Sequence, residues 1–564
     1  MSSTIDTEVQ NYREPPETHA EPGHVNYLKD GYSIWSWLFT VDHKRIAILY
    51  LVFLVIFFAV GGAFAGLVRL NLISPSGAIL DNDTYNKTFT AHGVVMLFLF
   101  LIPSIPGVMG NFFVPMMVGA KDMAFPKLNI MSWYVWIIGA AFAIWALAAG
   151  GIDTGWTLYP PYSSRSSHTN VVPGVFGVFI TGFSSIMTGL NIIVTIHRMR
   201  APGMTWGRLP LFCWAMYATS LIQLLATPVL AITLALLIIE SASNALGNPI
   251  GIFDPALDGD PILFQHMFWF YSHPAVYIMI IPGMGVVSEI LTCFSRKNIF
   301  GYTAVAWSSV GIAIIGFLVW AHHMFVAGIS YYAALLFSML TMLVAVPSAI
   351  KVFNWTSTLY RGAISFQAPM IFGLGFLVLF TIGGLTGLPL ATLGSDIHFH
   401  DTYFVVAHFH FVMVGGMVLA FLGALHYWWP KMFGVMYSDF WSRIGSILII
   451  TGYILTFTPQ FWLGYHGMPR RYPNYPPEFQ FLNVMSTAGY TVQLAGFLMI
   501  ATYLTLSFFT GRKAGPNPWG ATGLEWMTPS PPITHNFEHI PRVVCGPYEY
   551  SLNLTQTGER ADVR

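Results

Sequence analysis

The sequence predicts an all-α membrane protein with twelve transmembrane helices and both termini in the cytoplasm. Hydrophobic residues make up 55% of its 564 residues and charged residues only 9%, whereas an ordinary soluble domain has about 25% charged residues. Apolar runs long enough to cross a hydrocarbon core of about 30 Å recur along the chain. The predicted spans are residues 46–70, 88–118, 130–150, 172–197, 209–240, 262–292, 301–328, 332–358, 367–391, 402–430, 441–464 and 485–511.

The orientation follows from the charges between the spans, because cytoplasmic loops accumulate Lys and Arg. The loops after even-numbered spans carry ten of these residues: Lys121, Lys127, Arg198, Arg200, Arg208, Arg296, Lys297, Arg361, Lys431 and Arg443. The loops after odd-numbered spans carry five: Arg69, Lys87, Arg165, Arg470 and Arg471. Both termini are therefore expected inside, where Lys44-Arg45 and Arg512-Lys513 flank the first and last spans.

One helical membrane domain is expected at residues 41–511, between a polar N-terminal tail (1–40) and an irregular C-terminal tail rich in Pro and Gly (512–564). Residues 1–30 have no apolar stretch typical of a cleaved secretory signal, so the first span is expected to insert the protein. The three cysteines lie far apart and predict neither a disulfide nor a zinc site. The formal net charge is zero and gives no indication of nucleic-acid binding.

Several predicted spans contain His near their outer halves. In chain order these residues are His92 in the second span, His273 in the sixth, His322 and His323 in the seventh, and His408 and His410 in the tenth. A single buried His often only hydrogen-bonds a carbonyl, but ionisable residues inside a membrane are costly, so six together favour a function. Neutral imidazole is a common ligand of transition metals, whereas a hard-cation site would need acidic residues that do not accompany these six.

Helix geometry divides these residues into groups. His408 and His410 point to nearly opposite faces of one helix and are expected to hold different metals. His322 and His323 diverge by about 100°, so a modest distortion lets both reach one ion, with His273 completing a three-His site that suits copper or catalytic zinc. His92 remains to pair with His408 or His410. Dividing the six His residues into groups of three, two and one predicts two haems beside the three-His metal. One haem is closed by two His ligands, and the other is open toward that metal.

Eleven segments of the chain match the landmarks of one family in that family's order. They are HKRIAILY, YNKTFTAHG, GNFFVP, KDMAFPKLN, DTGWTLYPP, GDPILFQHMFWF, HPAVY, VWAHHMF, KVFNW, HDTYFVVAHFHFV and GMPRRY. Over roughly residues 40–510, the sequence closely resembles subunit I of the haem-copper oxidases. The resemblance implies that subunit's twelve-helix fold and a respiratory terminal oxidase that reduces O2 to water and pumps protons.

The same resemblance implies the cofactors and their ligands. Two haems are expected, with haem A as the expected type, together with copper B and magnesium. The implied ligands are His92 and His410 for the low-spin haem, His408 for the oxygen-binding haem, His273, His322 and His323 for copper B, and His400 and Asp401 for magnesium shared with a subunit II carboxylate. Near the haems, the resemblance places Arg470, Arg471, Trp156 and Asp396 at propionates and Arg69 at a formyl group.

Two proton paths are also implied. Tyr277 lies one helical turn after His273, on the same face, and in the family it is joined covalently to that His and supplies an electron and a proton. Lys351, for which the alternative is a lysine that only snorkels to the interface, resembles the K-channel lysine, with Ser348 and Ser288. Asp122, on its own an ordinary loop charge, resembles the D-channel entrance, with Asn111, Asn129 and Asn191.

The inner end of the D path departs from the common pattern, because Ala275 stands where many members have Glu. Tyr271 lies one turn before it, on the same face, so Tyr271 and Ser272 are expected to replace that carboxylate, as in the subgroup called type A2. The alternative is that Tyr271 only packs and all protons use the Lys351 path.

The expected partners are subunit II, which carries a fused cytochrome c in many type A2 enzymes, subunit III and small subunits, in a bacterial inner (plasma) membrane. Electrons are expected from cytochrome c or another respiratory complex. Two other functions remain open: a quinol oxidase of the same fold, if subunit II lacks a two-copper site, and a metal-free proton-coupled transporter that uses buried His relays.

Overall fold

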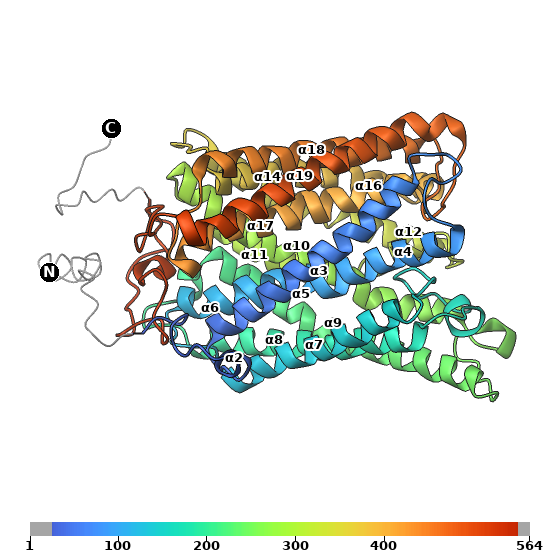
Figure 1. The fold of residues 1–564 in the computed structure, drawn as a ribbon, viewed down its shortest axis with the longest axis horizontal. Coiled ribbons are helices and arrows are strands. Elements are labelled where there is room, and N and C mark those ends of the chain that lie inside the picture. Colours follow the sequence, from blue (N-terminus) through green and yellow to red (C-terminus); the bar gives the residue numbers. More distant parts are fainter. Residues whose placement is uncertain (1–24, 551–564) are drawn as a thin grey trace, which may run out of the picture.

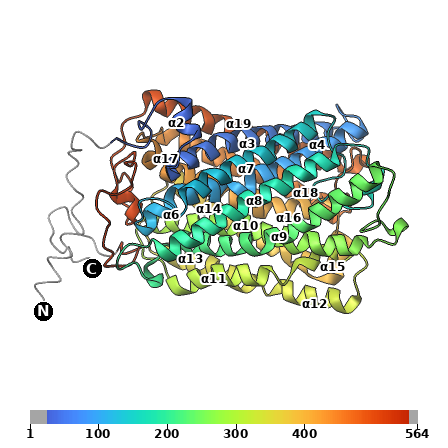
Figure 2. The same ribbon diagram turned by 90° about the horizontal axis from the view of Figure 1, so that it is seen from below.

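The computed structural model describes residues 25–550, and within that range the chain is helical, with isolated β-bridges only. Figures 1 and 2 show a bundle of long helices that run roughly side by side. The α-helices are α2 (Ile34–Leu38), α3 (His43–Asn71), α4 (Asn82–Val94), α5 (Ile102–Ser104), α6 (Asn111–Val118), α7 (Pro126–Ala148), α8 (Val171–Arg198), α9 (Leu211–Ala245), α10 (Pro261–Ser295), α11 (Tyr302–Gly316), α12 (Tyr331–Met342), α13 (Ala345–Leu359), α14 (Ala368–Ala391), α15 (Leu393–Phe399), α16 (Tyr403–Val412), α17 (Leu419–Phe433), α18 (Asp439–Tyr465) and α19 (Gln480–Thr510).

Shorter helical turns join or interrupt these helices. The π-helical turns are η1 (Val95–Leu101), η2 (Ile105–Gly110), η3 (Tyr162–Ser166) and η7 (Met413–Val418). The 3-10 turns are η4 (Trp206–Arg208), η5 (Pro255–Leu257), η6 (Trp320–Met324), η8 (Pro477–Phe479) and η9 (Leu524–Met527). Turns η1 and η2 make α4, α5 and α6 one continuous span, Asn82–Val118. It begins six residues before the prediction because the Asp81 carboxylate caps it at Thr84 N.

Eleven helices within residues 25–550 are long and apolar enough to cross a membrane, where twelve spans are predicted. The difference lies in the predicted seventh span, residues 301–328, whose α-helix α11 has only 15 residues. Helix α11 ends at Gly316, where a Cβ atom would lie 2.6 Å from Tyr277 Cδ2. The chain then forms η6, which carries His322 and His323.

Helix α10 lies at the centre of the bundle. The most apolar part of its span is 89% buried, against 17% for the span that contains α12 and α13. It packs on α9, α14, α17 and η6, and it carries Tyr271, Ser272, His273 and Tyr277. The sixth predicted span is therefore in position to bring site residues together with those of several other helices.

The C-terminal tail is irregular, as predicted, but it is packed against the bundle. Figure 1 shows the red tail and the blue start of α3 at the same end of the molecule. Asn26 forms a β-bridge with Ile533, and Tyr27 N donates to Pro532 O. Trp526 of η9 is buried. The described N- and C-terminal parts therefore lie together at one end of the bundle, called the tail end below.

Candidate metal and haem centre

One cavity of about 1820 Å³ contains all six predicted His ligands in its lining. Its volume exceeds that of an ordinary small-molecule site, about 300–1,000 Å³, and gives room for more than one large ligand. Most of its other lining residues are aliphatic or aromatic, from α3, α10, α13, α14, α16, α17 and α19. The cavity is therefore suited to flat apolar groups held by a few polar side chains.

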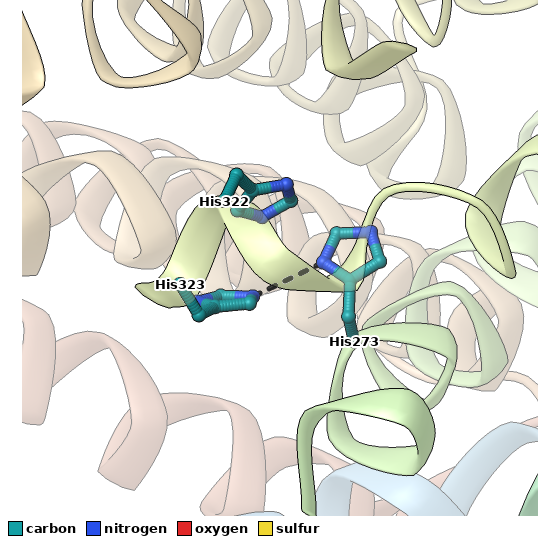
Figure 3. A group of neighbouring side chains, drawn as sticks. All are labelled: His273, His322 and His323. Carbon is teal, nitrogen blue, oxygen red and sulfur yellow. Dashed lines mark hydrogen bonds between the residues drawn. The ribbon is translucent and has the colours of Figure 1, made fainter. Parts of the chain in front are cut away.

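His273, His322 and His323 form the one three-ligand metal group of this kind within residues 25–550, with ligand atoms within 4.8 Å of one another. Figure 3 shows the adjacent pair on one turn of ribbon, with both rings near His273 of the neighbouring helix. His273 Nδ1 lies 3.1 Å from His323 Nε2. The two adjacent rings approach one point because α11 has ended and they lie on η6, a separate 3-10 turn.

Neighbouring side chains fix these three rings. Trp269 stacks on His323 with centroids 3.7 Å apart, and Thr341 Oγ1 lies 3.1 Å from His322 Nδ1. His273 Nε2 is buried and has no hydrogen-bond partner within the described part of the chain. An uncharged, closely spaced three-imidazole set fits copper or zinc better than a hard cation.

His92 and His410 face each other across the cavity. Their rings are nearly parallel, at 8°, with centroids 6.4 Å apart. His92 Nδ1 donates to Gly61 O at 2.9 Å, and His410 Nδ1 donates to Val406 O at 2.8 Å. Because each Nδ1 carries the proton, each Nε2 keeps a lone pair for a metal. The pair fits a single iron held from both sides.

His408 lies on the same helix as His410 but is held separately. Its Nδ1 is 3.3 Å from Thr386 Oγ1, and its ring passes Gly387, where a Cβ would lie 2.9 Å from Cε1. The lack of a side chain at Gly387 lets the ring lie close to α14. The structure therefore gives His408 and His410 different surroundings, as helix geometry predicts.

Two other buried His residues show a different arrangement. His426, which sequence reasoning did not single out, bonds Leu422 O through Nδ1 and the Tyr503 hydroxyl through Nε2. His43 bonds Asn111 O and the Asn536 side chain. Both ring nitrogens of each residue are engaged, so these two residues have structural roles that contrast with those of the cavity residues.

Comparison with known proteins decides the family. A family model described as "Cytochrome C and Quinol oxidase polypeptide I" matches residues 45–492. The chain belongs to this family. A solved heme-copper terminal oxidase dimer shares the fold, with a TM-score of 0.73 over 83% of this chain and 84% of its own, at 21% identity.

Three curated relatives named "Cytochrome c oxidase subunit 1" match nearly the whole chain. The protein of Synechocystis sp. is 45% identical over 92% of this chain and 94% of its own length. That of Thermostichus vulcanus is 41% identical over 94% and 96%, and that of Bacillus subtilis is 39% identical over 91% and 82%. The chain is thus a catalytic subunit of a terminal oxidase, an oxidoreductase of the respiratory chain.

Family membership also confirms several broader predictions. It implies haem and copper as cofactors and a multi-subunit complex that includes subunit II. The bacterial relatives and the eleven apolar helices identify a multi-pass protein of the bacterial plasma membrane. The transporter alternative, which required a metal-free protein, is excluded by this membership.

The cavity end opposite the tail is rich in charge in this oxidase subunit. Arg470 forms an ion pair with Asp401 at 2.6 Å, and Asp396 forms one with His400 at 3.2 Å. Burial lowers the pKa of Arg471 to about 10, so its guanidinium stays charged at neutral pH. The cavity lining at this end includes Arg470, Arg471, Asp396, Asp401, His400 and Trp156. Two adjacent cations there suit carboxylates such as haem propionates.

Arg69 lines another part of the same cavity. One terminal nitrogen donates to Asn483 O and Oδ1, at 2.9 and 3.0 Å. Its Nε is buried without a protein partner among the described residues. A buried N–H of this kind is costly unless it meets an acceptor.

The predicted K-path residues are not joined in one hydrogen-bonded chain. Lys351 is buried and donates to Ser309 Oγ at 2.8 Å and Val305 O at 2.9 Å. Ser288 Oγ instead accepts from Trp355 Nε1 at 2.9 Å. Ser348 and Tyr277 line the cavity. Ser309, from α11, is a polar partner that sequence reasoning missed.

The predicted D-path residues lie between the tail end and α10. Asn191 accepts from Phe125 N and donates to Phe125 O, at 2.9 and 3.0 Å, and so fixes the loop that carries Asp122. Burial raises the pKa of Asp122 to about 7, and the nearby Asp42 adds to the shift. Both polar atoms of the Asn129 side chain, and Oδ1 of Asn111, are buried without protein partners in the described range.

Polar side chains also lie near Tyr271. A small cavity beside α8 and α9 is lined by Tyr50, Ser184, Thr188, Gln223 and Tyr271. Tyr271 also lines the large cavity, as does Ser272, whose Oγ has no protein partner within residues 25–550. Tyr271 thus borders both cavities.

Proposed function

We propose that this oxidase subunit reduces O2 to water with electrons from cytochrome c, received through subunit II, and moves protons outward. The observation that carries the proposal is the single cavity in which the three-His cluster, His408 and the facing pair His92 and His410 occur together. When bound, the two haem irons and copper B supply the electron transfer and the site of O2 reduction. His92 and His410 would hold the low-spin haem, His408 the high-spin haem, and His273, His322 and His323 copper B.

The contact between Tyr277 and His273 supports a role for Tyr277 as a proton and electron donor at this centre. Its ring centroid is 4.7 Å from that of His273. Both residues project from one face of α10, because they are one turn apart. We propose that the Tyr277 hydroxyl gives its proton to the reacting oxygen and is reprotonated through the path of Lys351, Ser348 and Ser288.

Haem A is supported by the chemistry of the cavity. Its apolar lining includes Val52, Leu425 and Leu498 from α3, α17 and α19. Val352 and Phe353 of α13 also line it. Such an apolar lining suits the long hydrocarbon tails of haem A or haem O, which haem B lacks. The unpartnered Nε of Arg69 would donate to a formyl oxygen, the group that distinguishes haem A from haem O.

Protons for pumping are proposed to pass from Asp122 by Asn111, Asn129 and Asn191 to Tyr271 and Ser272. Buried polar atoms without protein partners occur along this line, and such atoms are usually satisfied by ordered water. The hydroxyls of Tyr271 and Ser272 would hold the proton that Ala275 cannot hold.

The exposed charged end supports the proposed partners. His400 Nε2 and Asp401 Oδ2 lie 4.0 Å apart, and the Asp401 side chain is 60% exposed. We propose that they bind magnesium together with a carboxylate of subunit II, which would carry a two-copper site and, as in type A2 enzymes, a fused cytochrome c. Subunit III and small subunits would complete the complex.

The test is a pyridine haemochrome spectrum of the purified complex together with its oxidase activity on reduced cytochrome c and on quinol. The expected result is the haem A spectrum and oxidation of cytochrome c. A haem O or haem B spectrum would reject the assigned haem type, and oxidation of quinol alone would identify the other branch of the family.

A further inference from the structure

The C-terminal tail contacts the loop that carries Asp122. Asn536 is 1% exposed and adopts a φ of 63°, a left-handed conformation that Asn tolerates better than most residues. Its side chain lies between the start of α3 and the loop that follows α6. The tail therefore forms part of the wall around the proposed proton entrance.

The Asn536 amide bonds groups on both sides. Its Nδ2 donates to Ala120 O at 2.9 Å and to Lys121 O at 3.2 Å, the two residues just before Asp122. Its Oδ1 accepts from Lys44 Nζ at 2.9 Å. The ring of His43 also contacts this amide, and His43 Nδ1 bonds Asn111 O at 2.7 Å. One neutral side chain thus connects α3 to the Asp122 loop, and His43 extends the connection to Asn111.

The loop is held on its other side as well, because Asn191 bonds both backbone groups of Phe125. Lys44 also donates to Thr534 O at 2.8 Å and pairs with Asp42 at 3.2 Å. The charged groups that act on Asp122 are Asp42 and Lys44 at the start of α3, with Lys121 adjacent in the loop, and the backbone N–H groups of His43 and Met123 also bond its carboxyl group. The position of Asp122 among these charges depends on the hydrogen bonds of Asn536 on one side of the loop and those of Asn191 on the other.

We propose that Asn536 is a positioning residue of the proton entrance, which fixes Asp122 relative to Lys44 and Asn111 from the C-terminal tail. The inference rests on the proposed D path. An amide is suited to this role because it donates to two carbonyls and accepts from a cation at once. A carboxylate at this position would lose the donor and add a negative charge beside Asp42.

The burial that raises the pKa of Asp122 depends on the loop staying closed. Without the Asn536 hydrogen bonds, the Asp122 carboxyl group gains contact with water, and its pKa falls toward the usual value. Asp122 then loses its proton at a lower pH. The loss of turnover on the alkaline side of the pH profile should therefore begin at a lower pH.

The experiment compares Asn536→Gly, Asn536→Asp and Asp122→Asn in the intact complex reconstituted in vesicles. Glycine accepts the positive φ and so removes the amide without backbone strain. The matched control is Asn517→Gly, because the amide of Asn517 bonds the backbone of Ala521 within the tail, at 2.8 and 2.9 Å, and lies away from the Asp122 loop in the sequence. Turnover is measured against pH, with the proton-to-electron ratio and the KM for cytochrome c.

We expect both Asn536 variants to lower kcat and the proton-to-electron ratio. Asn536→Gly should also shift the alkaline limb by about one pH unit to lower pH, the scale of one lost hydrogen bond, whereas the added negative charge of Asn536→Asp favours the protonated form of Asp122 and opposes that shift. KM and haem content should stay unchanged, and Asn517→Gly should match the parent. If Asp122→Asn impairs pumping while both Asn536 variants keep the parent's pH profile, the inference is wrong. If Asp122→Asn has no effect, the D path itself is wrong. If the Gly variant does not assemble, Asn536→Asp decides by kcat and the proton-to-electron ratio, and parent values of both would show the inference to be wrong.

Discussion

The imidazole rings of His92 and His410 lie nearly parallel across the cavity, at 8°, with centroids 6.4 Å apart. Each ring is fixed by a hydrogen bond from Nδ1 to a backbone carbonyl, of Gly61 and Val406 respectively. The two rings come from helices far apart in the sequence, so their alignment depends on the whole bundle. The arrangement predicts a haem closed on both faces, which passes electrons and does not bind O2.

The first prediction concerns this pair. His410→Leu should remove one axial ligand and abolish the low-spin haem signal in optical and magnetic circular dichroism spectra. Copper content should be unchanged, because the three-His cluster is separate. His197→Gln, at an exposed His bonded to Tyr217, serves as the control and should leave both spectra as in the parent. A low-spin signal retained in His410→Leu would contradict the assignment.

The second prediction concerns the hydroxyls next to the metal cluster. Tyr271→Phe with Ser272→Ala should slow turnover at least tenfold and reduce the proton-to-electron ratio, since positioned proton carriers contribute about 10²–10⁴-fold to rates. Proton release and oxygen consumption by vesicles measure both effects. Tyr437→Phe, which removes a buried hydroxyl bonded to His426 O, is the control. Parent rate and stoichiometry in the double variant would show that Tyr271 only packs.

The third prediction separates Lys351 from its unforeseen partner. Lys351→Met should stop proton delivery to Tyr277 and almost eliminate turnover. Ser309→Ala should have a smaller effect, about tenfold, because a hydrogen bond to a charged group contributes about 1.5–3 kcal/mol and 1.4 kcal/mol corresponds to a factor of ten. Stopped-flow reduction of the oxidised enzyme measures both. An unaffected Lys351→Met variant would exclude this path.

The fourth prediction concerns haem type. Arg69→Gln should shift the visible absorption of the low-spin haem to shorter wavelength and raise the formyl stretching frequency, because the formyl oxygen loses a charged donor. Resonance Raman spectra measure the stretch. Arg208→Gln, on a loop at the tail end, should change neither. Unchanged spectra in Arg69→Gln would place the formyl group elsewhere.

Most of the fold was predictable because apolar runs and intramembrane His residues are visible locally. Helix α10 and the opposed faces of His408 and His410 follow from spacing along one helix. The short α11 was not predictable, since it ends where the Tyr277 ring from another helix meets Gly316. Ser309 and Asn536 were missed for the same reason: each acts through a side chain brought from a remote segment, and Asn536 lies in a tail whose composition suggests only irregular structure.

The most direct test of the oxygen-reducing centre is the iron and copper content of the purified complex, compared with that of His273→Asn. The account predicts two haem irons per chain in both proteins, one copper fewer in the variant, and no oxidase activity in the variant. Equal copper in the two proteins, or an active complex without haem iron, would contradict it.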